Sequence, residues 1–185
     1  MTVLTPANQL TLVRVLLIPA LVILIVYQHF GGALVAFVTA GVTDALDGLI
    51  ARRAGHKSTL GAWLDPMADK LLLVTTFIVL TLPGLGLINR IPVWLTVLII
   101  SRDVVIVLTV AIVNLAVGPR TFRPSIFGKA ATAIYIATCV VIMYENWLGR
   151  QSFWVDFWVY SALAITLVSS GHYLIYTTRV INRGE

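Results

Sequence analysis

Long apolar segments follow one another along almost the whole chain, and they constrain its fold more than any other feature. We expect six helical segments, each close to or longer than the roughly 20 residues that cross a bilayer. Turn signals such as Gly31-Gly32 and Pro83-Gly84 separate them. The pattern predicts an all-α, polytopic membrane protein with six transmembrane helices and a short interfacial N-terminal segment at residues 6–10. The expected helices cover residues 9–28, 33–52, 60–82, 91–117, 126–147 and 153–180.

Composition supports a membrane-spanning chain. Of its 185 residues, 59% are hydrophobic and 11% are charged, whereas a soluble domain has about 25% charged residues. The length fits one domain, which we expect to cover residues 1–185. The net charge is +5. In a membrane chain such a charge reflects basic residues in cytoplasmic loops or attraction to anionic lipid headgroups, rather than binding to nucleic acid. Cys139 is the single cysteine, which excludes a disulfide framework and a cysteine-ligated zinc site.

The basic residues predict how the spans are oriented. Lys and Arg gather in alternate inter-helix loops and at the C-terminus, whereas the loops of the other side hold only Arg90 and Arg150. By the positive-inside rule both termini face the cytoplasm, and a bacterial inner membrane is the expected location. The residues on the cytoplasmic side are Arg52, Arg53, Lys57, Arg120, Arg123, Arg179 and Arg183.

Four aspartates stand within 26 residues of this apolar chain. Ionised carboxylates at membrane depth are costly unless they are paired, solvated or bound to a cation. Asp47 follows Asp44 by three positions, and Asp69 follows Asp65 by four, so each pair lies on one helix face. The linker between the helices is short, so they pack antiparallel and bring the two pairs together. All-oxygen ligation suits Mg²⁺, Mn²⁺ or Ca²⁺, and two such ions would clamp a diphosphate.

Buried acids also have other roles in membranes. A single intramembrane aspartate often forms a hydrogen bond between helices, and transporters line cation or proton pathways with acids. Here the acids flank a basic loop at one end of the spans, which favours phosphate binding. Polyprenyl transferases bind Mg-diphosphate through two separated acidic clusters, a pattern that differs from this one. A divalent-cation transporter stays as the alternative from a different class of protein.

The arrangement Asp44-x2-Asp47-Gly48-x2-Ala51-Arg52-x8-Gly61-x3-Asp65-x3-Asp69 resembles the signature of the CDP-alcohol phosphotransferase family at every fixed position. The stretch Asn8-x-Leu10-Thr11-x-x-Arg14, the six-helix layout and the chain length are similar to that family as well. The resemblance implies transfer of a phosphatidyl group from CDP-diacylglycerol to an alcohol, with release of CMP, in phospholipid biosynthesis. It also implies a homodimer in the lipid bilayer.

The resemblance assigns roles to residues by motif position. Asp44, Asp47, Asp65 and Asp69 would ligate two divalent ions, Mg²⁺ or Mn²⁺, and Asp69 would also be the general base on the acceptor hydroxyl. The CDP-linked donor is already activated, so the acceptor would attack the β-phosphorus directly without a covalent intermediate. The CDP site would be lined by Gly48, Ala51, Arg52, Ser58 and Gly61, and Asn8, Thr11 and Arg14 would reach the donor diphosphate.

Basic residues of the second half of the chain predict a pocket for a phosphate-bearing acceptor. Arg102 lies within the fourth expected helix, Lys129 lies near the start of the fifth, and Arg123 lies in the loop between them. Arginine suits bidentate contact with phosphate, and basic groups at membrane depth mark substrate sites. The alternative is that Arg102 pairs with Asp103 or extends its charge towards water.

Two acceptors compete. Glycerol 3-phosphate would make the chain similar to the phosphatidylglycerophosphate synthases, as the run Leu64-Asp65-Pro66-x-Ala68-Asp69-Lys70 suggests. That group usually has an Arg-Glu pair in the fourth span, where this chain has Ser101-Arg102-Asp103. Phosphatidylglycerol would make it similar to the CMP-forming cardiolipin synthases, which the run Phe122-Arg123-Pro124-Ser125-x-x-Gly128-Lys129 resembles. We expect glycerol 3-phosphate, with phosphatidylglycerol as the alternative.

Overall fold

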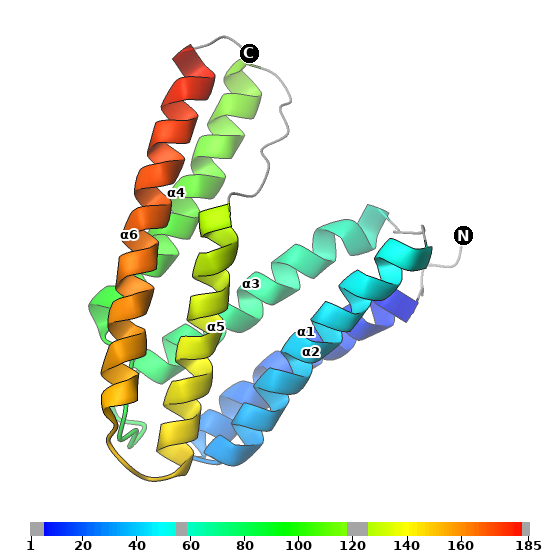
Figure 1. The fold of residues 1–185 in the computed structure, drawn as a ribbon. Helices are drawn as coiled ribbons and strands as arrows, with labels where there is room; N and C mark the ends of the chain where they lie inside the picture. The colour runs from blue at the N-terminus through cyan, green and yellow to red at the C-terminus, as the bar shows by residue number, and fades with distance from the viewer. Residues whose placement is uncertain (1–5, 55–58, 118–125, 183–185) are drawn as a thin grey trace. The chain divides into compact units, whose positions relative to one another are not determined.

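The computed structural model describes residues 6–54, 59–117 and 126–182, and the side chains of residues 13–43, 67–112, 115, 126–175 and 178. All the regular structure in these ranges is helical (Figure 1). The six expected helices are confirmed, and their ends lie within three residues of the predicted ones. They are α1 (Pro6–Val26), α2 (Phe30–Ala54), α3 (Thr59–Thr81), α4 (Val93–Val117), α5 (Ile126–Trp147) and α6 (Phe153–Asn182).

One local expectation near the N-terminus is wrong, and another stays a prediction. Residues 6–10 are the first turns of α1, and their interfacial position stays a prediction. Gly31-Gly32 is not a loop, because α2 already begins at Phe30. The turn before α2 uses Gln28, whose φ of 62° is the left-handed conformation that glycine more often supplies. The Gln28 side chain fixes this turn from outside, since its Nε2 donates a hydrogen bond to the Leu85 carbonyl at 3.1 Å.

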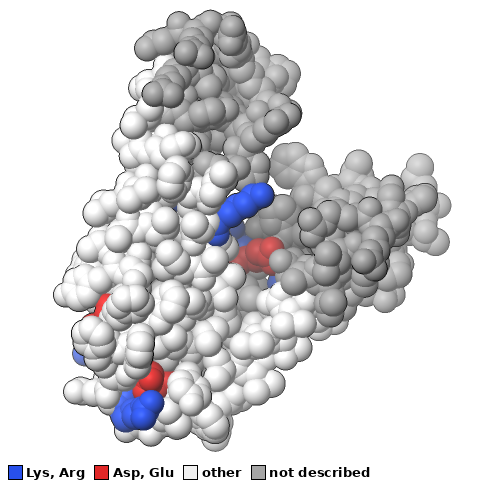
Figure 2. All heavy atoms as spheres, viewed as in Figure 1, with Lys and Arg blue, Asp and Glu red and all other residues white. Residues whose placement is uncertain are grey.

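Three of the helices have, within their described residues, the length and composition of membrane-spanning segments. Among the described residues, Val93–Ile112, Ile126–Trp147 and Phe153–Ile175 are long and apolar enough to cross a bilayer, and Val13–Val26 and Phe30–Thr43 are shorter apolar helices. Large apolar side chains point outwards, Leu115 with 88% of its surface exposed. On the face drawn in Figure 2, few of the described atoms belong to charged residues. A soluble protein would not expose so many large apolar side chains, and the chain is an integral membrane protein.

The helices form two compact units. The first contains α1, α2, α3 and the C-terminal part of α5, from residues Met1–Arg90 and Cys139–Gln151. In this unit α1 packs against both α2 and α3 (Figure 1). Leu21 of α1, Ala33 of α2 and Leu80 of α3 are completely buried. The helix α1 therefore holds in place the two helices that carry the aspartates.

The second unit contains α4, the N-terminal part of α5 and α6, from residues Ile91–Thr138 and Ser152–Glu185. The helix α4 packs along α6. Polar side chains tie α5 to α6: the hydroxyls of Tyr135 and Thr166 lie 2.6 Å apart, and Thr138 donates to the Trp158 carbonyl at 3.3 Å. Hydroxyls buried in an apolar setting require such partners, because leaving them unbonded is costly.

Candidate functional site

The aspartate pairs lie on two helices of the first unit. Asp44 and Asp47 belong to α2, and Asp65 and Asp69 belong to α3. Continuous helix at these positions places the members of each pair about one turn apart, as their spacing predicts. The side chains of Asp44, Asp47 and Asp65 lie outside the described residues. Their role as metal ligands stays a prediction.

Asp69, the last acid of the motif, forms an ion pair with Arg14 of α1. The Arg14 Nη1 donates to the Asp69 Oδ1 at 2.8 Å. The guanidinium is buried, with 1% of the side chain exposed, whereas 42% of the Asp69 side chain is exposed. Both residues also take part in other interactions. The sequence predicts that Arg14 reaches the donor diphosphate. In the structure Arg14 contacts Asp69, the predicted general base.

A buried arginine in an apolar surrounding has a specific electrostatic consequence. Guanidinium keeps its charge in proteins, so its charge must be balanced by an acceptor when water is excluded. A charge-assisted hydrogen bond of ordinary length to a carboxylate does this. The partly exposed face of Asp69 remains accessible from outside the helix packing. A second ligand can therefore approach the same carboxylate.

For the residues predicted to line the CDP site, the structure describes at most the backbone. Asn8 and Thr11 lie in α1, and Gly61 lies in α3, but their side-chain positions are outside the described residues. Ser58 lies outside the described backbone as well. The roles of these residues stay predictions, as do those of Gly48, Ala51 and Arg52, which belong to α2.

The donor set fits a hard divalent cation by its chemistry. Carboxylate oxygens are the ligands that Mg²⁺ and Mn²⁺ prefer. Asp69 offers a partly exposed carboxylate, and Asp65 lies one turn away on the same helix, α3. Within the residues whose side chains are described, no group of three or more His, Cys, Asp or Glu residues gathers. Three of the four aspartates fall outside that part of the chain, so this finding does not bear on the predicted ligand set.

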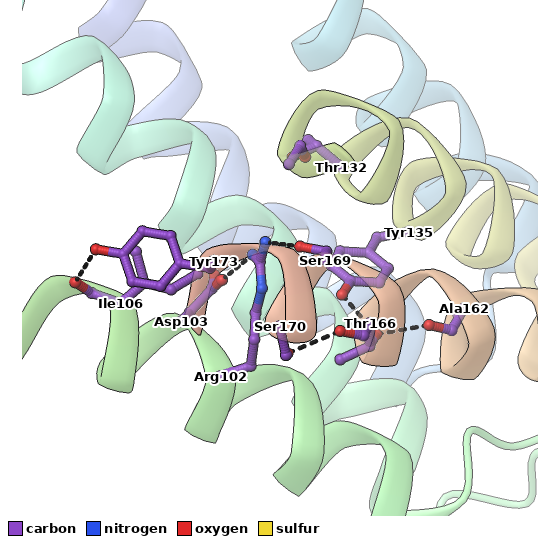
Figure 3. Close-up of polar contacts among 11 residues, drawn as sticks. Arg102, Asp103, Ile106, Thr132, Tyr135, Ala162, Thr166, Ser169, Ser170 and Tyr173 are labelled. Carbon is purple, nitrogen blue, oxygen red and sulfur yellow. Dashed lines mark hydrogen bonds and ion pairs between the residues drawn. The ribbon is translucent and has the colours of Figure 1, made fainter. Parts of the chain in front are cut away.

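A second polar cluster lies inside the second unit, between α4 and α6 (Figure 3). Arg102 donates from Nη1 to the Asp103 Oδ1 at 2.7 Å and from Nη2 to the Ser169 Oγ. Only 14% of the Arg102 side chain is exposed. Its Nε is buried without a hydrogen-bond partner among the described residues. On the same two helices, the Tyr173 hydroxyl donates to the Ile106 carbonyl at 3.3 Å.

This cluster bears on the predicted acceptor pocket. Pairing of Arg102 with Asp103 was the alternative to a phosphate contact, and the structure contains that pair. The partnership with Ser169 was not predicted from the sequence, because nothing local links residues 67 positions apart. Lys129 is an exposed residue of α5. Arg123 lies outside the described residues, and the acceptor role of all three residues stays a prediction.

A third polar group, in the first unit, was also missed from the sequence. Asn89 and Asn146 are buried and bond each other, and the Asn89 Nδ2 donates to the Arg150 carbonyl at 2.8 Å. The Arg150 Nε in turn donates to the buried Glu145 carboxylate at 2.7 Å. This hydrogen bond, with the attraction between the charges, raises the pKa of Arg150. Polar residues at the end of an apolar helix, Glu145-Asn146, are the sequence signal for such a network.

Comparison with known proteins places the chain in a family. The profile of the family described as CDP-alcohol phosphatidyltransferase matches residues 4–169. The chain is 38% identical over 148 residues to the human CMP-forming cardiolipin synthase, an alignment that covers 71% of this chain and 48% of the relative. It is 37% identical over 136 residues to the CMP-forming cardiolipin synthase of Streptomyces coelicolor, covering 70% of this chain and 60% of the relative.

A third relative has a different name. The chain is 38% identical over 128 residues to the probable phosphatidylglycerophosphate synthase of Mycobacterium tuberculosis, covering 66% of this chain and 57% of the relative. The chain thus spans about half to three-fifths of the length of these curated relatives. The family profile, in contrast, covers most of the chain, from the first turns of α1 to α6. The chain belongs to the CDP-alcohol phosphatidyltransferase family.

Proposed function

We propose that this protein transfers the phosphatidyl group of CDP-diacylglycerol to an alcohol and releases CMP, as a step of phospholipid biosynthesis. The spacing of the four aspartates on α2 and α3, in a chain of the CDP-alcohol phosphatidyltransferase family, is the observation that supports this most. The contact between Arg14 and Asp69 adds to it, because Arg14 ends the stretch of α1 that resembles the family and Asp69 is the last acid of the motif.

In the proposed reaction Asp69 accepts the proton of the acceptor hydroxyl. The hydroxyl oxygen forms a bond to the phosphorus that carries diacylglycerol, and the bond from that phosphorus to the CMP oxygen breaks. CMP leaves with the electron pair, and no covalent enzyme intermediate is needed. General-base assistance of this kind contributes a factor of about 10²–10⁴ in rate.

Two divalent ions, Mg²⁺ or Mn²⁺, would be held by Asp44, Asp47, Asp65 and Asp69. When bound, they would neutralise the diphosphate and the charge that develops on CMP. Arg52 and Ser58 would contact the CDP group, where Gly48, Ala51 and Gly61 would allow close approach of the nucleotide. Asn8 and Thr11 of α1 would lie towards the donor diphosphate.

Glycerol 3-phosphate is the proposed acceptor, and phosphatidylglycerol is the second candidate. The relatives support both, because they are named phosphatidylglycerophosphate synthase and cardiolipin synthase. Arg102, Lys129 and Arg123 would bind the acceptor phosphate. In that case Arg102 would turn one of its donors to phosphate while Asp103 and Ser169 hold the rest of the guanidinium.

The membrane arrangement follows from the same proposal. All six helices would span the bilayer as one domain, with both termini and the aspartates on the cytoplasmic side of a bacterial inner membrane. Apolar side chains on the outer faces of the helices support this arrangement. We also propose that the protein works as a homodimer, and measurement of its molecular mass in detergent or nanodiscs would test this.

The test is release of CMP from the purified full chain with CDP-diacylglycerol and Mg²⁺ or Mn²⁺. Glycerol 3-phosphate and phosphatidylglycerol are supplied in separate reactions, and the lipid product is identified by mass. The test variant is Asp69→Asn, which is expected to be inactive. Its matched control is Asp156→Asn, which removes an exposed carboxylate of α6 that belongs to no motif. CMP that forms only with one acceptor identifies that acceptor.

Absence of CMP with every alcohol would refute the proposal. Uptake of a divalent cation into proteoliposomes without any nucleotide would then support the transporter. Equal CMP release by the wild type and Asp69→Asn would refute the role of Asp69 while keeping the reaction.

A further inference from the structure

The ion pair between Arg14 and Asp69 places the permanent charge of an arginine at a carboxylate that would bind an exchangeable divalent ion in the proposed function. Arg14 has 1% of its side chain exposed and lies 2.8 Å from the Asp69 Oδ1. Water therefore cannot replace the carboxylate as the partner of this guanidinium. Asp69 is different, since 42% of its side chain is exposed outside the helix packing.

A divalent ion bound to Asp69 would lie close to the Arg14 charge. Oxygen–metal distances at Mg²⁺ are about 2.1 Å, so the two cations would share one carboxylate at a separation of a few ångströms. Like charges at that distance repel one another strongly where water is scarce. The carboxylate has enough lone pairs for both partners, but each one weakens the hold of the other.

We propose that Arg14 is a resident counter-cation of Asp69 that competes with the divalent ion. In the cation-free protein, Arg14 balances the Asp69 charge and stabilises the packing of α1 against α3. When the divalent ion binds, the Arg14–Asp69 contact weakens, so the affinity for the ion is lower than the aspartates alone would give. The inference rests on the proposed function, and it assigns Arg14 to the cation site in addition to the predicted contact with the donor diphosphate.

The opposite arrangement is also physically reasonable and makes the inference testable. A second group that only orients a ligating carboxylate strengthens metal binding, and its loss weakens the affinity. A competing cation does the reverse, so that its loss tightens binding. The sign of the change in Mn²⁺ affinity therefore separates the two roles.

The experiment measures Mn²⁺ binding to the purified full chain by calorimetry and electron paramagnetic resonance, without CDP-diacylglycerol. Arg14→Gln is purified with Mg²⁺ present, stripped with a chelator and titrated beside the wild type. We expect at least tenfold tighter Mn²⁺ binding and a lower unfolding temperature of the stripped protein. The rise of unfolding temperature with added Mn²⁺ should be larger in the variant, because ligand stabilisation follows the affinity.

Arg90→Gln is the matched control, since it makes the same change at an exposed residue between α3 and α4 and should leave Mn²⁺ affinity unchanged. Should Arg14→Gln fail to fold even with Mg²⁺, Arg14→Met is titrated instead. Its unbranched apolar side chain fills the buried site without a charge, and an affinity above the wild type is expected again. Affinity equal to or below the wild type overturns the inference and leaves the proposed reaction untouched. Wild-type protein that binds no Mn²⁺ overturns both.

Discussion

Asn89 and Asn146 bond each other reciprocally across 57 residues of chain. The Asn89 backbone N–H donates to the Asn146 Oδ1 at 3.0 Å, and the Asn146 Nδ2 donates to the Asn89 carbonyl at 2.9 Å. Asn146 thereby satisfies both backbone polar groups of one residue in a loop. Both residues are buried. The end of α5 is in this way fixed to the loop between α3 and α4, within the first unit.

Asn146→Ala should therefore destabilise the protein without a direct effect on the proposed chemistry. The change leaves the Asn89 N–H and carbonyl buried without these partners, and each such loss costs about 1–3 kcal/mol. Thermal unfolding in detergent should show a clear decrease of the transition temperature. Thr109→Val is the control, since that hydroxyl bonds the Val105 carbonyl of its own helix. Equal transition temperatures for Asn146→Ala and the wild type would contradict the bonded pair.

Two glycines of α2 should respond in opposite ways to alanine. A Cβ on Gly31 would come within 2.9 Å of the Trp147 Nε1, whereas a Cβ on Gly41 would meet nothing within 4 Å. Gly31→Ala should cost about 1–3 kcal/mol through overpacking. Gly41→Ala should be neutral or stabilise by up to about 1 kcal/mol, because alanine favours the helix. The same unfolding assay compares them, and equal effects would show that Trp147 does not pack on Gly31.

The helices were predictable from the sequence because each apolar run is long enough to be read by itself. The start of α2 was not predictable in the same way, because Gly31-Gly32 is a strong local turn signal. In the structure the turn before α2 lies at Gln28. Gly31 is inside α2, where the side chain of Trp147 packs against it. The aspartate spacing indicated the site, but the partner of Asp69 was not predictable. Arg14 meets it from 55 residues away, and such pairing depends on helix packing rather than on local pattern.

Asp69→Asn should abolish the proposed transfer while the protein stays folded. The amide cannot accept the acceptor proton and is a weaker cation ligand, so we expect at least a 10³-fold decrease in kcat. The check is CMP release at saturating CDP-diacylglycerol, with the unfolding transition measured on the same preparation. Loss of activity together with loss of the folded transition would attribute the effect to stability. Chelation of divalent ions should inactivate the wild type, and Mg²⁺ or Mn²⁺ should restore it.

Arg102→Gln should change the use of the acceptor more than the use of the donor. Arg102 is held by Asp103 and Ser169, and it has one buried donor, Nε, without a bond among the described residues. Glutamine keeps a polar group but loses the charge and the bidentate fork that suits phosphate. We expect KM for the acceptor to rise at least tenfold and KM for CDP-diacylglycerol to stay within about twofold, because removal of one charge-assisted contact is worth roughly 1.5–3 kcal/mol. Steady-state kinetics with each substrate varied in turn measures both constants.

Ser169→Ala is the matched variant for Arg102, since it removes one of the groups that hold the guanidinium but leaves its charge in place. It should raise the acceptor KM by less than Arg102→Gln does, because the pair with Asp103 at 2.7 Å still fixes one end of the side chain. An acceptor KM that stays constant in Arg102→Gln, with kcat and the unfolding temperature both lower, would assign Arg102 to the packing of α4 against α6. In that event the acceptor phosphate must bind elsewhere.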